Sequence, residues 1–122
     1  AVSCHAQSKN WHAACLATKE LALKAFQAIP HRVHGGTDNC LPNTLYISFA
    51  DIHAEALIVC LKEVAEISTG SACTSASYSP SHVLTAMNLD EEEATKVVRF
   101  SWSPQTNPKV WNEIAKRLTA LL

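Results

Sequence analysis

The 122-residue chain lacks the features that define several large protein classes. No apolar run approaches the ~18 residues of a transmembrane helix. The formal net charge of −1 at pH 7 provides no attraction for nucleic acid or for an anionic membrane surface. The opening residues 1–5 have neither the charged nor the apolar block of a signal peptide. We therefore predict a protein that has neither nucleic acid nor a membrane as its partner.

The cysteines and histidines follow no metal or disulfide pattern. The chain has five cysteines, an odd number, and no C-x-x-C pair, which argues against a disulfide framework and against a zinc ribbon. The six histidines are scattered, and their spacing matches no metal template. The sequence thus predicts no metal site, and a reducing cytoplasm is the simplest setting.

The composition is that of one small globular domain. Apolar residues make up 48% of the chain and charged residues 17%, which excludes a disordered protein, and the length can enclose one modest core. Residues 1–10 are polar and unpatterned, so they are an arm, a chain boundary or a disordered tail. Residues 11–122 are predicted to form a single domain.

Apolar periodicity predicts short strands among helices. A helix is expected from Trp11 to the stop at Pro30. Further helices are expected after Asp51, after Ser79–Pro80, after Asp90 and after Asn107–Pro108. The strands are expected at residues 31–34, 45–49, 66–68 and 97–102. The fold class is α+β: an antiparallel or mixed sheet of three or four short strands, with helices packed on one face.

Several side chains have predicted structural roles. Asp51 is expected to cap its helix, and Asp90 with Glu93 forms a capping-box-like start. Trp102 and Trp111 are expected in the core or at an interface. The expected apolar stripes of the helices contain, among others, Val64, Val83, Leu84, Met87, Leu121 and Leu122.

One stretch is unusual in the chemistry it offers. Residues 68–77 read Ser-Thr-Gly-Ser-Ala-Cys-Thr-Ser-Ala-Ser, which cannot bury much surface and predicts an exposed loop. Cysteines without a disulfide are usually buried, so Cys73 on such a loop is either a chance surface residue or a reactive thiol. Composition alone leaves both readings open.

Other motifs, in their order along the chain, decide between these readings. Together with the Cys73 loop they resemble the C-terminal part of the cysteine desulfurases, in particular the NifS/IscS-like class with a long, flexible cysteine loop. The resemblance is dense from Gly35 to Ser101. It implies the small domain of the fold-type I enzymes that depend on pyridoxal phosphate. The motifs are Leu41–Thr44, Asp51–Leu57, Ser79–Leu84, Leu89–Ala94 and Val98–Ser101.

The resemblance implies roles for two residues. Cys73 would be the nucleophile that takes sulfur from L-cysteine as a persulfide, leaves L-alanine and passes the sulfur to an acceptor such as an iron–sulfur scaffold. Arg99, in an Arg-Phe-Ser motif, would bind the α-carboxylate of the substrate. From spacing alone, Arg99 would more simply have a structural role, either in an ion pair such as one with Glu91 or Glu92 or as a residue at the strand end whose guanidinium reaches to water.

The chain lacks the family's cofactor residues. No His-Lys pair occurs, so the resemblance implies that pyridoxal phosphate is bound by a large domain of a homodimeric parent enzyme. No cofactor is expected on this chain alone, which would be inactive. Trp102–Thr106 replaces the Leu-Gly-Arg-Phe-Thr common in the family, and the chain ends at Leu122 without the longer scaffold-docking tail of some members. Two alternatives remain: a stand-alone, non-catalytic sulfur carrier or partner-binding module, and a relative that acts on selenocysteine.

Overall fold

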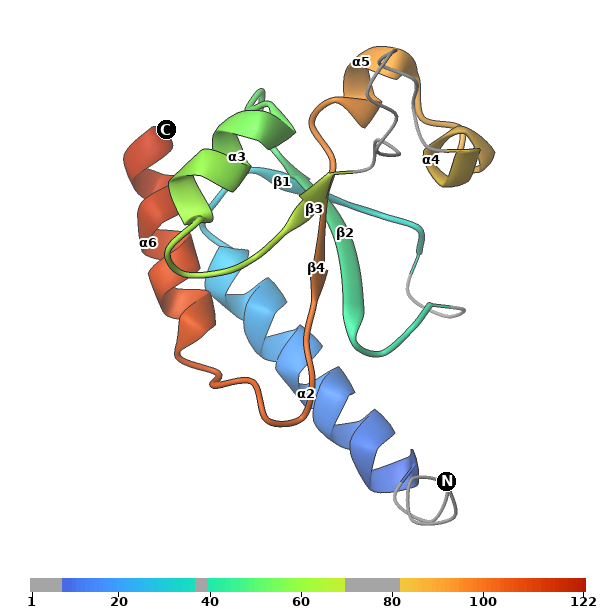
Figure 1. Ribbon diagram of the computed structural model, residues 1–122, viewed down its shortest axis with the longest axis vertical. Helices are drawn as coiled ribbons and strands as arrows, with labels where there is room; N and C mark the ends of the chain where they lie inside the picture. The colour runs from blue at the N-terminus through green and yellow to red at the C-terminus, as the bar shows by residue number, and fades with distance from the viewer. Residues whose placement is uncertain (1–7, 37–39, 70–81) are drawn as a thin grey trace.

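The computed structural model describes residues 8–36, 40–69 and 82–122, and its elements follow the predicted order. The helices and strands alternate irregularly along the chain (Figure 1), as in an α+β protein. The elements are α2 (Ser8–Phe26), β1 (His31–His34), β2 (Thr44–Phe49), α3 (Ala54–Leu61), β3 (Ser68–Thr69), α4 (His82–Ala86), α5 (Glu91–Ala94), β4 (Val98–Ser101) and α6 (Val110–Leu121).

The four strands form one antiparallel sheet in the order β1-β2-β4-β3. Strand β2 pairs with β1 on one side and with β4 on the other, and β4 pairs in turn with β3. The chain therefore leaves the sheet after the edge strand β3 and re-enters it one position inward. The predicted α+β fold with a small sheet is confirmed.

The core lies between one face of the sheet and the helices α2, α3 and α6. Alternate residues of β2 are buried, as expected for a strand with one solvated face, and β4 shows the same alternation. In Figure 1, α2, α3 and α6 lie together on one side of the strands. The buried side chains that join these elements include Phe26, Ile47, Phe49, Leu57, Phe100, Trp111 and Leu118.

Aromatic rings fill the centre of this core. Phe26 of α2 meets the ring of Phe49 edge-on, with centroids 5.1 Å apart, and that of Trp111 at 6.1 Å. Trp111 also contacts Trp102 in a T-shaped arrangement at 5.5 Å, the geometry that aromatic quadrupoles favour. Trp102 and Trp111, which were expected in the core or at an interface, are core residues, since they are 6% and 3% exposed.

A second, smaller apolar cluster lies on the other face of the sheet. Leu84 of α4, Ala94 of α5 and Val97 are buried there, and the half-buried Tyr46 of β2 packs against them. Tyr46 points away from the main core because its neighbours Leu45 and Ile47 point into it. This cluster fixes the short helices that precede β4.

The helix starts differ in part from the predictions. Helix α2 begins at Ser8, three residues before Trp11, and the predicted arm otherwise lies outside the described residues. Asp51 does not cap α3: the N-cap is His53, which has no side-chain cap bond, and the Asp51 carboxylate instead accepts a hydrogen bond from Lys96 at 3.0 Å. A carboxylate near a helix start can bind a cation from a distant segment instead of capping the helix. Sequence patterns do not reveal such long-range pairs.

Some of the other capping and core predictions are confirmed and some are wrong. Asp90 caps α5 as expected, with its carboxylate accepting from the backbone N–H of Glu93 at 2.7 Å. The short helices expose part of their predicted stripes: Val83 is 40% exposed whereas Leu84 is buried, because a helix of five residues has room for one inward position. At the chain end Leu121 and Leu122 are also exposed. Val64 lies beyond α3, which ends at Leu61, although it still packs against the core.

Phe26 should be a principal contributor to stability. Phe26→Ala removes a fully buried ring that contacts three other aromatic side chains, so the free energy of unfolding should fall by about 3–5 kcal/mol. Val59→Ala, at a position 77% exposed, is the control and should change it by less than about 0.5 kcal/mol. Urea denaturation measures both. Similar losses for the two variants would contradict the placement of the core.

Candidate functional site

Arg99 lies on the face of the sheet that the main core does not cover. Its neighbours Val98 and Phe100 are buried in that core, so the alternation of a strand directs Arg99 to the opposite face. It is flanked directly by Tyr46 of β2 and Ser68 of β3. Residues opposite each other in a ladder project to the same side of the sheet. Tyr46, Arg99 and Ser68 therefore form one cross-strand row, with the exposed Arg99 in the middle.

The acidic partners suggested by spacing are not used. Glu92 accepts a hydrogen bond from Lys96 at 3.2 Å. In the part of the chain that the structure describes, no ion pair joins Arg99 to Glu91 or Glu92. The ion pair considered from spacing is therefore not formed with these two residues, whereas the exposure of Arg99 agrees with the other structural reading, a side chain that reaches to water. The planar fork of the Arg99 side chain has the geometry to bind a carboxylate through two hydrogen bonds.

Cys73 and the predicted helix start Ser79–Pro80 lie outside the described residues. Their flanks are defined, since Thr69 pairs with Val98 and α4 begins at His82. Cys73 is thus four residues beyond a strand that adjoins β4.

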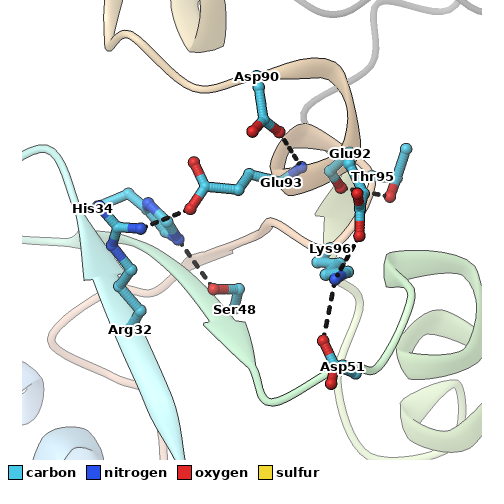
Figure 2. Close-up of polar contacts among 9 residues, drawn as sticks. All are labelled: Arg32, His34, Ser48, Asp51, Asp90, Glu92, Glu93, Thr95 and Lys96. Atoms are coloured by element: carbon cyan, nitrogen blue, oxygen red, sulfur yellow. Dashed lines mark hydrogen bonds and ion pairs between the residues drawn. The ribbon is translucent and has the colours of Figure 1, made fainter.

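A polar network secures the segment between α4 and β4. Figure 2 shows the Lys96 ammonium between the carboxylates of Asp51 and Glu92, from which it lies 3.0 and 3.2 Å away. The hydrogen bonds to Asp51 and Glu92 raise the pKa of Lys96. On the other side of α5, the Arg32 guanidinium donates to the Glu93 carboxylate at 2.5 Å. These contacts tie α5 to β1 and to the turn after β2, which fixes where β4 begins.

His34 closes the same side of the sheet. Its Nε2 lies 2.9 Å from the Ser48 hydroxyl (Figure 2), and its side chain is buried. Burial lowers the pKa of His34, and the nearby positive charge of Arg32 lowers it further, while Glu93 acts in the opposite direction. The imidazole is thus kept neutral near pH 7 in a hydrogen bond between neighbouring strands.

Two of the described lysines have other partners. Lys19 donates to the Cys40 sulfur at 3.0 Å and Lys96 is held by two carboxylates. A Schiff-base site for pyridoxal phosphate needs a lysine beside groups that hold the phosphate and the ring nitrogen, and neither Lys19 nor Lys96 has that setting. In residues 8–36, 40–69 and 82–122, no three metal-ligating side chains gather. None of the helices that the structure describes is long and apolar enough to cross a membrane.

Sequence reasoning missed three of these contacts: Arg32–Glu93, His34–Ser48 and Lys19–Cys40. Each joins residues that lie between 14 and 61 positions apart. Only the contact between β1 and β2 had a local signal, since two adjacent predicted strands place polar side chains on one shared face.

Comparison with solved structures defines the fold class first. The chain is similar to a NifS-like protein with a TM-score of 0.76 at 19% identity, over 94% of this chain and 29% of that one. It is also similar to DndA from Streptomyces lividans, with a TM-score of 0.57 at 44% identity over 81% of this chain and 28% of the other. The fold is that of a part of the NifS-like proteins. No protein-family model matches the chain.

Curated sequences then give the family. The chain is 46% identical over 88 residues to cysteine desulfurase IscS of Vibrio atlanticus. These 88 residues are 71% of this chain and 22% of that protein. It is 40% identical over 96 residues to a cysteine desulfurase of Azotobacter chroococcum, over 77% of this chain and 24% of the other. The chain belongs to the NifS/IscS-like cysteine desulfurase family, as the sequence predicted. It spans about a quarter of the length of the curated relatives it matches.

The buried His34 should make the protein sensitive to acid. Because the folded state lowers the pKa of His34, the unfolded chain takes up its proton first as the pH falls. This contribution to stability is therefore complete above pH ~6.5 and is lost as the pH drops below that value. Urea denaturation from pH 7.5 to 5 should show a falling free energy of unfolding. The slope should be shallower in His34→Gln and unchanged in the surface control His53→Gln. An identical slope in His34→Gln would contradict this assignment.

Proposed function

We propose that this chain is the C-terminal domain of a cysteine desulfurase, in which Cys73 accepts sulfur from L-cysteine and Arg99 holds the substrate. The observation that carries the proposal is the place of Arg99. It is exposed on a strand that adjoins β3, the strand leading to Cys73. Homology to curated cysteine desulfurases over about three quarters of the chain supports this choice of chemistry.

The reaction assigned to Cys73 is a transfer of sulfur. Its thiolate attacks the sulfur of the substrate, an S–S bond forms and the Cβ–S bond of the substrate breaks. The electron pair of that bond remains on Cβ, which takes up a proton to give L-alanine. Cys73 then carries a persulfide, a reversible modification that the thiol of an acceptor can remove. A segment of small and hydroxylated residues suits a thiol that must reach two different sites.

Arg99 would position the substrate for this attack. The guanidinium presents two parallel N–H donors, which match the two oxygens of an α-carboxylate. The buried side chains of Val98 and Phe100 anchor β4 on both sides of Arg99, so its backbone is held in place. A substrate bound to Arg99 would lie beside β3, the strand that precedes the Cys73 segment.

The remaining parts of the activity would come from outside the described residues. Pyridoxal phosphate supplies an electron sink when it is bound, and we place it in a large domain of the parent enzyme, a homodimer in the cytoplasm. This chain alone should then be inactive. The sulfur acceptor would be a protein thiol, such as that of an iron–sulfur scaffold.

Cys73→Ala in the full-length enzyme should abolish persulfide formation, because the variant has no thiol to accept sulfur. It should still bind L-cysteine, since Arg99 and the cofactor are unchanged. Alanine release and persulfide labelling measure the reaction, and the cofactor absorbance change on adding cysteine measures binding. Cys60→Ala, which removes a half-buried thiol of α3 that contacts the backbone of α6, is the control and should keep full activity. Normal alanine and sulfide production by Cys73→Ala would refute the assignment.

Arg99→Lys should mainly raise the KM for cysteine, because a single point charge replaces a two-pronged grip. We expect an increase of about tenfold or more, the equivalent of one lost charged hydrogen bond of about 1.5–3 kcal/mol. Arg32→Lys changes an exposed arginine in an ion pair and should leave KM within about twofold. An unchanged KM in Arg99→Lys would rule out the carboxylate role.

Co-expression with a large-domain partner distinguishes the desulfurase from a stand-alone sulfur carrier or binding module. The desulfurase reading predicts a complex that contains both chains and the cofactor chromophore. Recovery of this chain without the partner, while it still carries sulfane sulfur, would favour the carrier instead.

A further inference from the structure

The two cross-strand neighbours of Arg99 differ strongly in size. Tyr46 lies directly opposite Arg99 on the β2 side, and Ser68 lies directly opposite it on the β3 side. The Cβ atoms of residues paired in this way are about 4.5–5.5 Å apart, so both side chains border the base of the arginine. A phenol ring therefore stands on one flank of Arg99, and a single hydroxymethyl group stands on the other.

The small apolar cluster holds the Tyr46 side chain in place. Tyr46 is half-buried and packs against the buried side chains of Leu84, Ala94 and Val97. Val97 comes two residues before Arg99, and its place in this cluster puts it on the same face of the sheet. The ring is thus fixed on the patch of the sheet from which the Arg99 side chain rises.

The Ser68 side of the row offers more room. Ser68 belongs to the edge strand β3, and its hydroxyl group donates to the backbone carbonyl of Thr69 at 3.3 Å. That hydrogen bond keeps the hydroxyl group on its own strand. Among the described residues of the row, the larger obstacle to the exposed Arg99 side chain is therefore on the β2 side, and the space is on the β3 side.

We propose that Tyr46 is a positioning residue of the substrate site, whose ring blocks the β2 flank of Arg99 and directs the guanidinium toward β3. This inference rests on the proposed function, because it names the residue that orients the arginine assigned to the substrate carboxylate. Fixing a long side chain on binding costs conformational entropy, and a wall that removes rotamers beforehand reduces that cost. The direction also matters, since β3 is the strand that precedes the Cys73 segment.

The bulk of the ring, and not its hydroxyl group, carries this role. The Tyr46 side chain also borders a cavity of about 260 Å³, whose lining includes Met87. Loss of the ring would join this space to the flank of Arg99, and the guanidinium could then turn toward β2. Phenylalanine would keep the wall and alanine would remove it.

Kinetics of the full-length enzyme test the proposal. Tyr46→Ala should raise the KM for L-cysteine about threefold or more and leave kcat within about twofold, because substrate binding is what loses its oriented partner. Tyr46→Phe should keep KM within about twofold of the unmodified enzyme. Met87→Ala is the matched control, since it removes another side chain that packs against the same cluster, and it should also keep KM within about twofold.

The outcomes separate this inference from the proposed function. If Arg99→Lys raises KM but Tyr46→Ala does not, the positioning role is refuted and the proposed function stands. If neither variant changes KM, the proposed function itself fails. An equal rise in Met87→Ala would also overturn the positioning role, because general loosening of the cluster would then account for the effect.

Ser68→Tyr tests the same geometry without removing any side chain from the cluster, and it decides the question if Tyr46→Ala does not fold. A ring on the open flank should obstruct the space toward β3, so the KM for L-cysteine should rise about threefold or more. Ser68→Ala is its control and should keep KM within about twofold, because the hydroxyl group is bonded within its own strand. An unchanged KM in Ser68→Tyr would contradict the inference.

Discussion

The alternation of β4 is the constraint on which the rest of the structure depends. Val98 and Phe100 enter the main core from this inner strand, and their burial fixes the opposite direction for Arg99. A shift of one residue in the register would bury the guanidinium and expose both apolar side chains. Burial of the apolar pair therefore stabilises the fold and presents the charged group at the same time.

The second contribution of β4 is its position between β2 and β3. The pairing of Ser68 with Arg99 brings the departure point of the cysteine segment next to the arginine. On the other side of that segment, α5 is tied to the body of the domain by Lys96, Arg32 and the small apolar cluster around Leu84. The described elements on both sides of the segment that contains Cys73 are thus well anchored.

The sequence predicted the architecture well because periodicity and burial agree in this chain. The strands at residues 31–34 and 45–49 and the inward positions of β4 follow from alternation alone. The long helices follow from their apolar residues, and Asp90 was recognised as a cap because its partner lies three residues away. Local chemistry of this kind is visible in a sequence.

Long-range polar pairing could not be predicted in the same way. Asp51 has the spacing of a helix cap but accepts a hydrogen bond from Lys96, 45 residues later. The roles proposed for Cys73 and Arg99 rest on resemblance to a family, since neither the small residues around the thiol nor the position of the arginine specifies a substrate. The family itself is supported by relatives 40–46% identical to this chain.

The most direct test of the account is a structure of the full-length enzyme with L-cysteine, or the product L-alanine, bound. We predict that the Arg99 guanidinium grips the α-carboxylate with two N–H···O hydrogen bonds of about 2.7–2.9 Å. A carboxylate bound by other groups, with Arg99 left in solvent, would contradict it.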